Sequence, residues 1–195
     1  MQSRSFISQA SSESLTALGR RAIRGFLVFL IVGVVPGVGV AQTAKGRTES
    51  TDRYVDSTLG FAFAKPRFPH PTAPGATTIA VTLSAPTEGG FAPNVNVLVH
   101  DLDMSLDDYQ LKQRQELQAT GWQVIELKPG KSGGRPSLRT HARGRLNGRE
   151  MEFLAITMKR DAKTLVVLTC TATAAQYPTY QAEFERVAAS FVLEP

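Results

Sequence analysis

The chain lacks the cysteines that several classes of small protein depend on. Its 195 residues include one cysteine, Cys170, so neither an internal disulfide framework nor a cysteine-rich zinc module can form. Cys170 stands in the middle of an apolar stretch, which predicts a buried core residue and not an accessible thiol nucleophile. No serine hydrolase is expected either. The sequence therefore does not favour covalent catalysis by a cysteine or serine nucleophile.

Phosphate-binding sequences are also missing. The tripeptide at 130–132 imitates the end of a P-loop, but Ile125 stands where that loop needs its first glycine. Nucleic-acid binding has little support, because the net charge of +5 is not concentrated in one globular region. Residues 1–41 hold four arginines against one glutamate, and the rest of the chain has 18 basic and 16 acidic residues. We therefore expect neither a nucleotide cofactor nor a nucleic-acid partner.

The first 41 residues have the pattern of an export signal. A basic region ends at Arg24, an apolar stretch follows, and Pro36 precedes small residues. Cleavage is expected between Ala41 and Gln42, because the signal peptidase pocket accepts small side chains before the cleaved bond. The apolar stretch over 26–41 is shorter than the ~20 residues of a membrane span, so no stable span is expected after processing.

Two alternatives remain open for this segment. It could be kept as a membrane anchor, and the pair at 20–21 resembles a twin-arginine signal, although the general export route fits its flanking residues better. Beyond it, residues 42–53 are small and polar and predict a flexible linker. A single domain is expected over 54–195. The lone cysteine suits an exported domain, since it cannot form wrong disulfide pairs within the chain.

The domain alternates strand and helix signals. Ser105 as N-cap, two acidic residues in the first turn and Gly121 beyond the last turn predict a helix that starts after Ser105 and ends before Gly121. A second helix from about 178 carries an apolar stripe through Phe184 and Phe191. Strands are predicted at 60–64, 78–83, 94–101, 122–127 and, as two hairpins, within 136–173, with loops at 66–74 and 129–134.

This order predicts an α+β fold, an α-β-α sandwich in which a mainly antiparallel sheet is covered by two long helices. Five short sequences resemble the PsbP/Mog-like superfamily, and its bacterial DcrB-like branch most of all. They lie at 94–97, 105–109, 133–136, 169–172 and 190–191. The resemblance covers roughly 54–193 and implies a non-enzymatic binding or assembly module, since members of the superfamily share no catalytic residues.

One strand of the first hairpin carries Arg139, His141, Arg143 and Arg145 on a single face. The Asn147-Gly148 dipeptide predicts a two-residue turn, which sets Arg145 opposite Glu150 and Arg143 opposite Glu152. A solvated salt-bridge ladder is the favoured interpretation of those two pairs. Arg139 and His141 would remain unpaired, and they are the candidates for a surface that binds a partner or ligand.

A second candidate group lies at the end of the strand over 94–101. His100 stands there beside Asp101 and Asp103, with two asparagines on the same strand face as the histidine. A metal site is conceivable, but turn formation before Ser105 is the simpler role for the two aspartates.

The sequence thus favours an exported, non-enzymatic module of the cell envelope that docks on another envelope protein and needs no cofactor. The alternative is a periplasmic protein that binds a small ligand or metal.

Overall fold

The structure is a computed structural model that describes residues 47–49, 52–69, 72–74 and 79–194. The expected signal segment, with its cleavage site at Ala41 and Gln42, lies outside the described residues. No helix among the described residues has the length and apolar character needed to cross a membrane.

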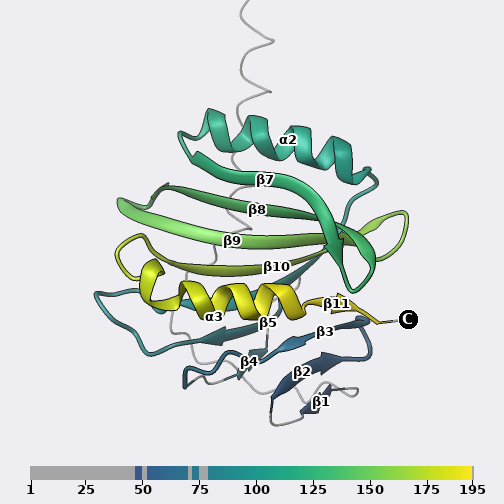
Figure 1. Cartoon of the computed structure of the whole chain (residues 1–195), viewed down its shortest axis with the longest axis horizontal. Helices are drawn as coiled ribbons and strands as arrows, with labels where there is room; N and C mark the ends of the chain where they lie inside the picture. The colour runs from purple at the N-terminus through teal and green to yellow at the C-terminus, as the bar shows by residue number, and fades with distance from the viewer. Residues whose placement is uncertain (1–46, 50–51, 70–71, 75–78, 195) are drawn as a thin grey trace, which may run out of the picture. The chain divides into compact units, whose positions relative to one another are not determined.

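The centre of the fold is a seven-stranded sheet in which all neighbouring strands are antiparallel (Figure 1). Its order is β4-β5-β6-β10-β9-β8-β7. The strands are β4 (Thr72–Pro74), β5 (Ile79–Ser84), β6 (Asn94–Asp101), β7 (Gln123–Ser132), β8 (Arg135–Leu146), β9 (Arg149–Lys159) and β10 (Thr164–Thr173). Strands β7 to β10 are each ten or more residues long, so they give the sheet one continuous surface.

A smaller antiparallel sheet contains β1 (Arg47–Glu49), β2 (Arg53–Asp56), β3 (Phe61–Ala64) and β11 (Val192–Leu193). It joins the two ends of the domain, because β11 pairs with β3. The linker expected over 42–53 is not all linker: β1 lies inside this range and pairs with β2. A short polar strand of this kind has no apolar period, so β1 could not be predicted from the sequence.

Helix α3 (Tyr177–Ser190) covers one face of the large sheet. Alternate residues of the strands point to that face, and they form the main apolar core with Phe184, Val187 and Phe191. All three of these side chains are fully buried, which confirms the predicted stripe. Burying such large side chains supplies about 2 kcal/mol each, so this layer is a main source of stability.

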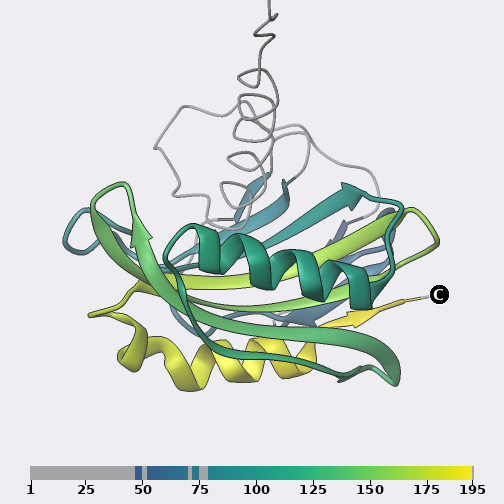
Figure 2. The same cartoon turned by 90° about the horizontal axis from the view of Figure 1, so that it is seen from above.

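Helix α2 (Leu106–Ala119) packs on β7 and β8 from the other side of the sheet (Figure 2). It begins as predicted, with the Ser105 hydroxyl accepting from the Asp108 amide at 3.0 Å. Its buried face is more polar than expected, because Gln113 and Glu116 are buried beside Tyr109 and Leu117. The predicted α+β sandwich, a mainly antiparallel sheet between two helices, is confirmed.

The β8–β9 hairpin has the predicted register at every pair, including Arg143 opposite Glu152. Its turn residues Asn147 and Gly148 have φ values of 50° and 81°, as the two-residue turn requires. Two predicted loops are partly strand. β7 continues to Ser132, so only Gly133 and Gly134 form the turn expected over 129–134, and β4 lies within the loop expected over 66–74. Prolines had suggested loops, but both strands lie at the sheet's edges, where proline is tolerated.

Candidate functional site

Arg139 is the centre of an ion-pair network that links β8, β7 and α3. Its Nε lies 2.6 Å from Glu126 Oε2, and its Nη2 lies 2.6 Å from Glu185 Oε1. Lys128 also binds Glu126. Burial by itself would lower the pKa of Arg139, but the hydrogen bonds to Glu185 and Glu126 raise it above its ordinary value. Arg139 is therefore fixed between two carboxylates.

The carboxylate of Glu126 is held in its charged form by the same contacts. The hydrogen bond from Lys128 is the largest cause that lowers the pKa of Glu126, and Arg139 lowers it further. Glu126 belongs to the edge strand β7, directly after a register shift between Val124 and Glu126. That bulge turns Glu126 to the face where Arg139 lies.

His141 lies beside this network, on the same strand face. Its Nε2 is 2.8 Å from Glu152 Oε1, and only 14% of the histidine side chain and 12% of the glutamate side chain are exposed. The imidazole stacks on the ring of Tyr177, with centroids 5.2 Å apart and an interplanar angle of 21°. Burial raises the pKa of Tyr177, so its hydroxyl stays protonated. This arrangement fixes the orientation of the histidine ring.

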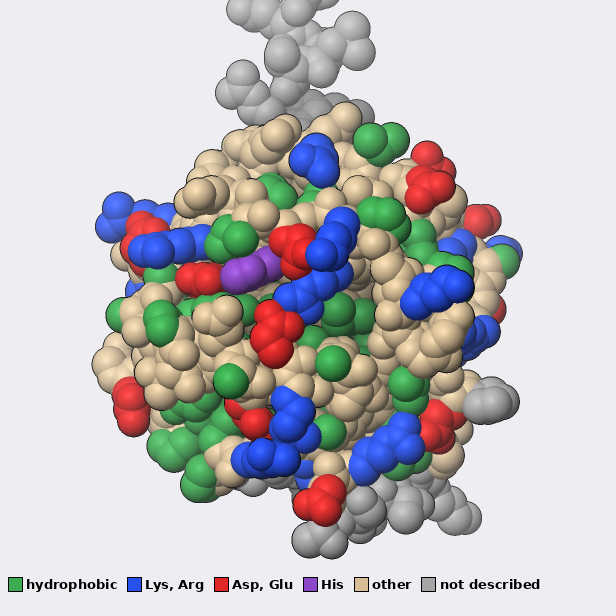
Figure 3. Space-filling model, viewed as in Figure 1, with side chains coloured by type: hydrophobic (Ala, Val, Ile, Leu, Met, Phe, Trp, Pro, Cys, Tyr) green, Lys and Arg blue, Asp and Glu red, His purple; other side chains and the backbone are tan. Residues whose placement is uncertain are grey.

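We call this group the ionic cluster. It consists of Glu126, Lys128, Arg139, His141, Glu152 and Glu185. Figure 3 shows a histidine surrounded by acidic and basic side chains on the face that carries α3.

The ionic cluster corrects two expectations about the strand. Arg139 and His141 are not unpaired, because β7, α3 and the diagonal neighbour Glu152 supply their partners. The salt-bridge ladder is wrong as well: Glu152 binds His141 instead of Arg143, and the Arg145 Nη2 reaches the Gly148 carbonyl at 3.3 Å. A correct register does not decide which of two neighbouring side chains takes a shared carboxylate.

The structure does not bring His100, Asp101 and Asp103 to the ionic cluster. Strand β6 is separated from β8 by β10 and β9, which puts about 14 Å between the strands. His100 is half-buried, and burial lowers its pKa while the nearby Asp101 opposes this shift. Both aspartates are exposed. The described residues contain no group of three or more His, Cys, Asp or Glu side chains that could hold a metal ion.

Cys170 is a core residue, as predicted. It is fully buried under α3, and its Sγ lies 3.9 Å from the carbonyl oxygen of Phe184. Burial raises the pKa of its thiol far above the ordinary value. The thiolate needed for nucleophilic chemistry is therefore not formed at neutral pH.

Residues 130–134 match the pattern Gly-x-Ser-x-Gly, in which hydrolases place a nucleophilic serine. The serine of this pattern is Ser132. In those enzymes the serine stands exposed on a turn from a strand into a helix. Here the pentapeptide is the end of β7 and the turn into β8, and Ser132 is buried. Its hydroxyl donates to the carbonyl of Phe191, so it ties the hairpin to the C-terminal end of α3.

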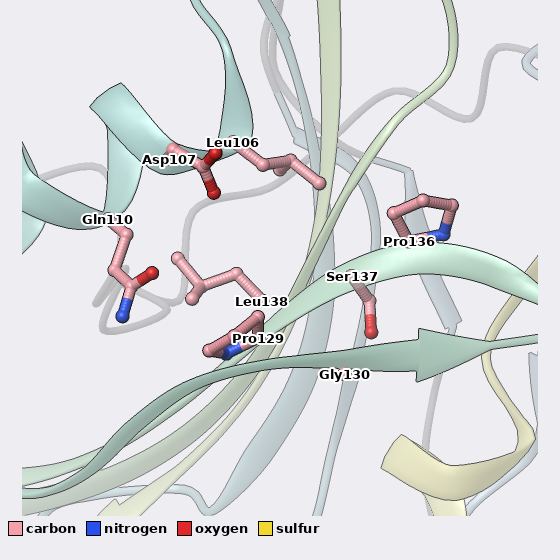
Figure 4. Close-up of a pocket in the computed structure, with 8 residues that line it drawn as sticks. All are labelled: Leu106, Asp107, Gln110, Pro129, Gly130, Pro136, Ser137 and Leu138. Atoms are coloured by element: carbon pink, nitrogen blue, oxygen red, sulfur yellow. The ribbon is translucent and has the colours of Figure 1, made fainter.

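A cavity of about 230 Å³ lies between the first turns of α2 and the β7–β8 hairpin (Figure 4). Its apolar walls are Leu106, Pro129, Pro136 and Leu138, and Gln110 points into it. Another cavity, of about 350 Å³, lies near the β2–β3 turn and is lined by Arg135, Arg160 and Glu194 among others. Neither lining includes a histidine or cysteine.

The sequence missed the partners of Arg139 because they are distant along the chain. Glu126 and Glu185 are 13 and 46 residues away from it. One signal was present: Glu185 follows the core residue Phe184 on the second helix, so it had to lie near the helix–sheet boundary. Glu126 gave no such signal, since the bulge at Val124 decides which face it takes.

Solved structures share this fold. CyanoP, a cyanobacterial PsbP from Synechocystis sp. PCC 6803, has a TM-score of 0.53 and 16% identity, covering 82% of this chain and 99% of its own. LpqN, described as involved in cell envelope biogenesis of Mycobacterium tuberculosis, has a TM-score of 0.54 and 12% identity, with coverages of 67% and 83%. PA94 of Pseudomonas aeruginosa, a protein of unknown function, has a TM-score of 0.52 and 14% identity, with coverages of 69% and 92%.

The chain therefore has the fold of PsbP-like proteins, which confirms at the level of the fold the resemblance found in its sequence. No family model matches the chain. No curated protein matches its sequence.

Proposed function

We propose that this chain is an exported, non-catalytic binding module of the cell envelope that docks on an acidic segment of another envelope protein. The observation that carries the proposal is the ionic cluster together with Arg143 and Arg145, neither of which has a carboxylate partner among the described residues. Export is supported by the signal pattern over 1–41. An envelope setting is supported by the printed description of LpqN, which shares the fold.

The side chains of the ionic cluster form a rigid charged surface. Arg139 and His141 are each held by two contacts from different elements, so little side-chain freedom is lost when a partner binds. Arg143 and Arg145 follow on the same strand face and are exposed. No ion pair joins either of them to a carboxylate in the part of the chain that the structure describes, whereas Glu150 is the one free carboxylate opposite them.

The excess of exposed arginines over free carboxylates on this part of the hairpin favours a partner with acidic side chains. Exposed arginine forks bind carboxylates with two parallel hydrogen bonds, and complementary charge speeds encounter between proteins. The alternative of a small-ligand protein would place its binding groups in a concave site. The ionic cluster is instead a surface feature, which suits a protein partner.

Site-specific photo-crosslinking in the native cell tests the proposal. A crosslinking residue at position 143 is expected to give one discrete protein adduct, and Arg145→Glu is expected to reduce it strongly. The matched control is position 114 on α2, an exposed arginine on the other side of the sheet. Equal adducts from positions 143 and 114, or no loss with Arg145→Glu, would contradict docking at this face.

A further inference from the structure

Two arginines from neighbouring strands line the cavity of about 350 Å³ near the β2–β3 turn. Arg135 is the first residue of β8, and Arg160 follows the last residue of β9. The β8–β9 register pairs Ser137 with Met158, and continued by two residues it sets Arg135 opposite Arg160. We call this cavity, with its two arginines, Glu194 and the turn at 57–60, the arginine pocket.

The tip of the β7–β8 hairpin is anchored where it borders the pocket. The Ser132 hydroxyl donates to the Phe191 carbonyl, and a β-carbon added at Gly133 would lie 2.7 Å from Val192 Cγ1. Figure 1 shows this tip beside β11. The backbone that carries Arg135 is therefore fixed by the C-terminal strand.

Nothing in the described part of the chain balances the charge of Arg135. The side chain makes no hydrogen bond or ion pair with any described residue, and it is exposed. Like charges that stand opposite each other on neighbouring strands destabilise a sheet. An anion bound between Arg135 and Arg160 would remove this repulsion.

The second arginine is already oriented. Arg160 Nη1 donates to the Leu59 carbonyl at 3.3 Å, and its Nε lies 3.3 Å from Asp161 Oδ2. Its Nη2 has no hydrogen-bond partner among the described residues. Since two contacts hold the guanidinium group, little side-chain freedom is lost when a ligand binds its remaining nitrogen.

Glu194 is the acidic residue in the lining, and its carboxylate is paired outside the lining. Arg53 Nη2 lies 3.4 Å from Glu194 Oε1. The Glu194 amide donates to the Gly60 carbonyl at 2.9 Å, which holds the residue beside the turn. Neither Arg135 nor Arg160 forms an ion pair with Glu194 in the described structure. Two arginines against one paired glutamate leave the lining with an excess of positive charge.

The pocket has both room and access for a ligand. Its volume lies at the small end of the roughly 300–1,000 Å³ found for ligand sites, which suits a compact molecule. Arg135, Ser57 and Thr58 are exposed, so the pocket opens to solvent.

The residues of the pocket select a phosphate group among anions. Guanidinium groups bind carboxylates and phosphates through paired N–H donors. A phosphate monoester offers three strong acceptor oxygens, so it can bind both arginines and one hydroxyl at the same time. Ser57 and Thr58 supply hydroxyls on the turn.

We propose that the arginine pocket binds a phosphate monoester, with Arg135 and Arg160 on its phosphoryl oxygens. The site is independent of the proposed docking face. Arg135 and Arg143 are eight residues apart on β8, which puts about 26 Å between them along the strand.

Two probes distinguish a soluble ligand from a lipid headgroup. Titration calorimetry of the full chain with glycerol 3-phosphate tests the soluble source. Cosedimentation with phosphatidylcholine vesicles that contain phosphatidate, a lipid phosphate monoester, tests the lipid source. Saturable binding of glycerol 3-phosphate would assign a soluble ligand, and binding only to the phosphatidate vesicles would assign a headgroup. Absence of binding to both probes would overturn the proposal, and so would equal binding to phosphatidylglycerol vesicles of the same surface charge.

Variants locate the binding at the pocket. Arg135→Gln is expected to weaken binding of the active probe by about tenfold, because charge-assisted hydrogen bonds are lost. Arg135→Lys keeps the charge but not the paired donors, so a smaller loss is expected. The matched control Arg114→Gln changes an exposed arginine of α2, on the other side of the sheet, and is expected to leave binding unchanged. Equal loss in Arg135→Gln and Arg114→Gln would overturn the proposal.

Thermal unfolding separates binding from a structural role. Without ligand, Arg135→Gln should melt at or above the wild-type temperature, because the repulsion from Arg160 is removed. A lower melting temperature would show that Arg135 stabilises the fold, and it would overturn the proposal. Arg145→Glu is expected to leave phosphate binding unchanged, because position 145 is further from the pocket than the screening length of salt water. Failure of the docking proposal and failure of this one are therefore distinguishable.

Discussion

The indole ring of Trp122 lies directly against the α-carbon of Gly144. A β-carbon added at position 144 would be 2.4 Å from Trp122 Cδ2 and 2.6 Å from Cγ. The ring cannot retreat easily, because Trp122 is buried and meets Phe153 edge to face with centroids 5.4 Å apart. Gly144 is thus required by packing, at a position with no unusual backbone angle.

Gly144→Ala is therefore expected to destabilise the domain by about 1–3 kcal/mol, the usual cost of overpacking a core. Urea unfolding followed by tryptophan fluorescence measures it, since Trp122 is the single tryptophan. Gly130→Ala is the matched control: its β-carbon would meet Ser137 Oγ at an ordinary 3.7 Å. Equal stability of the two variants would contradict the packing of Trp122 on Gly144.

The ionic cluster predicts a pH-dependent loss of stability in Glu126→Gln. Lys128 and Arg139 hold the pKa of Glu126 below its ordinary value. The stabilisation is present above the unfolded-state pKa of about 4.3 and is lost as the pH falls through the lower folded-state pKa. Because the pairs are partly exposed, the variant is expected to lose less than about 1 kcal/mol at pH 7.

Urea unfolding of Glu126→Gln and wild type at pH 7 and at pH 3 measures this effect. The difference in the free energy of unfolding between the two proteins should be smaller at pH 3 than at pH 7. Glu150→Gln removes a carboxylate that has no ion pair among the described residues, and it is expected to change stability little at either pH. A constant difference for Glu126→Gln across this pH range would mean that its contribution is not electrostatic.

Cys170 is expected to react with a thiol reagent only when the domain unfolds. The side chain is fully buried and its pKa is raised by that burial, so both access and thiolate are missing in the native protein. Labelling with Ellman's reagent at pH 8 measures this, and the exposed variant Thr87→Cys gives the rate of an accessible thiol. Labelling of native Cys170 at the Thr87→Cys rate would contradict its placement under α3.

Local signals decided which elements could be predicted from the sequence. Ser105 and the Asn147-Gly148 pair act through their own backbone neighbours, so the start of α2 and the β8–β9 register were predictable. The partners of Arg139 were not, because a bulge in β7 and the approach of α3 determine them. The sequence analysis placed Asn94 and Asn96 on one strand face, but only strand pairing shows that Thr169 and Thr171 lie beside them on the neighbouring strand.

The export prediction requires a test on the protein isolated from its own cell envelope. Native mass spectrometry is expected to find a chain that starts at Gln42, because small residues at 39 and 41 fit the signal peptidase pocket. Ala41→Leu places a large side chain at the cleaved bond and should retain residues 1–41, whereas Ala44→Leu, outside that pocket, should be processed normally. A wild-type chain that keeps residues 1–41 would instead support a retained anchor. The docking proposal would then apply to a partner near the membrane surface, because the apolar stretch would hold the domain there.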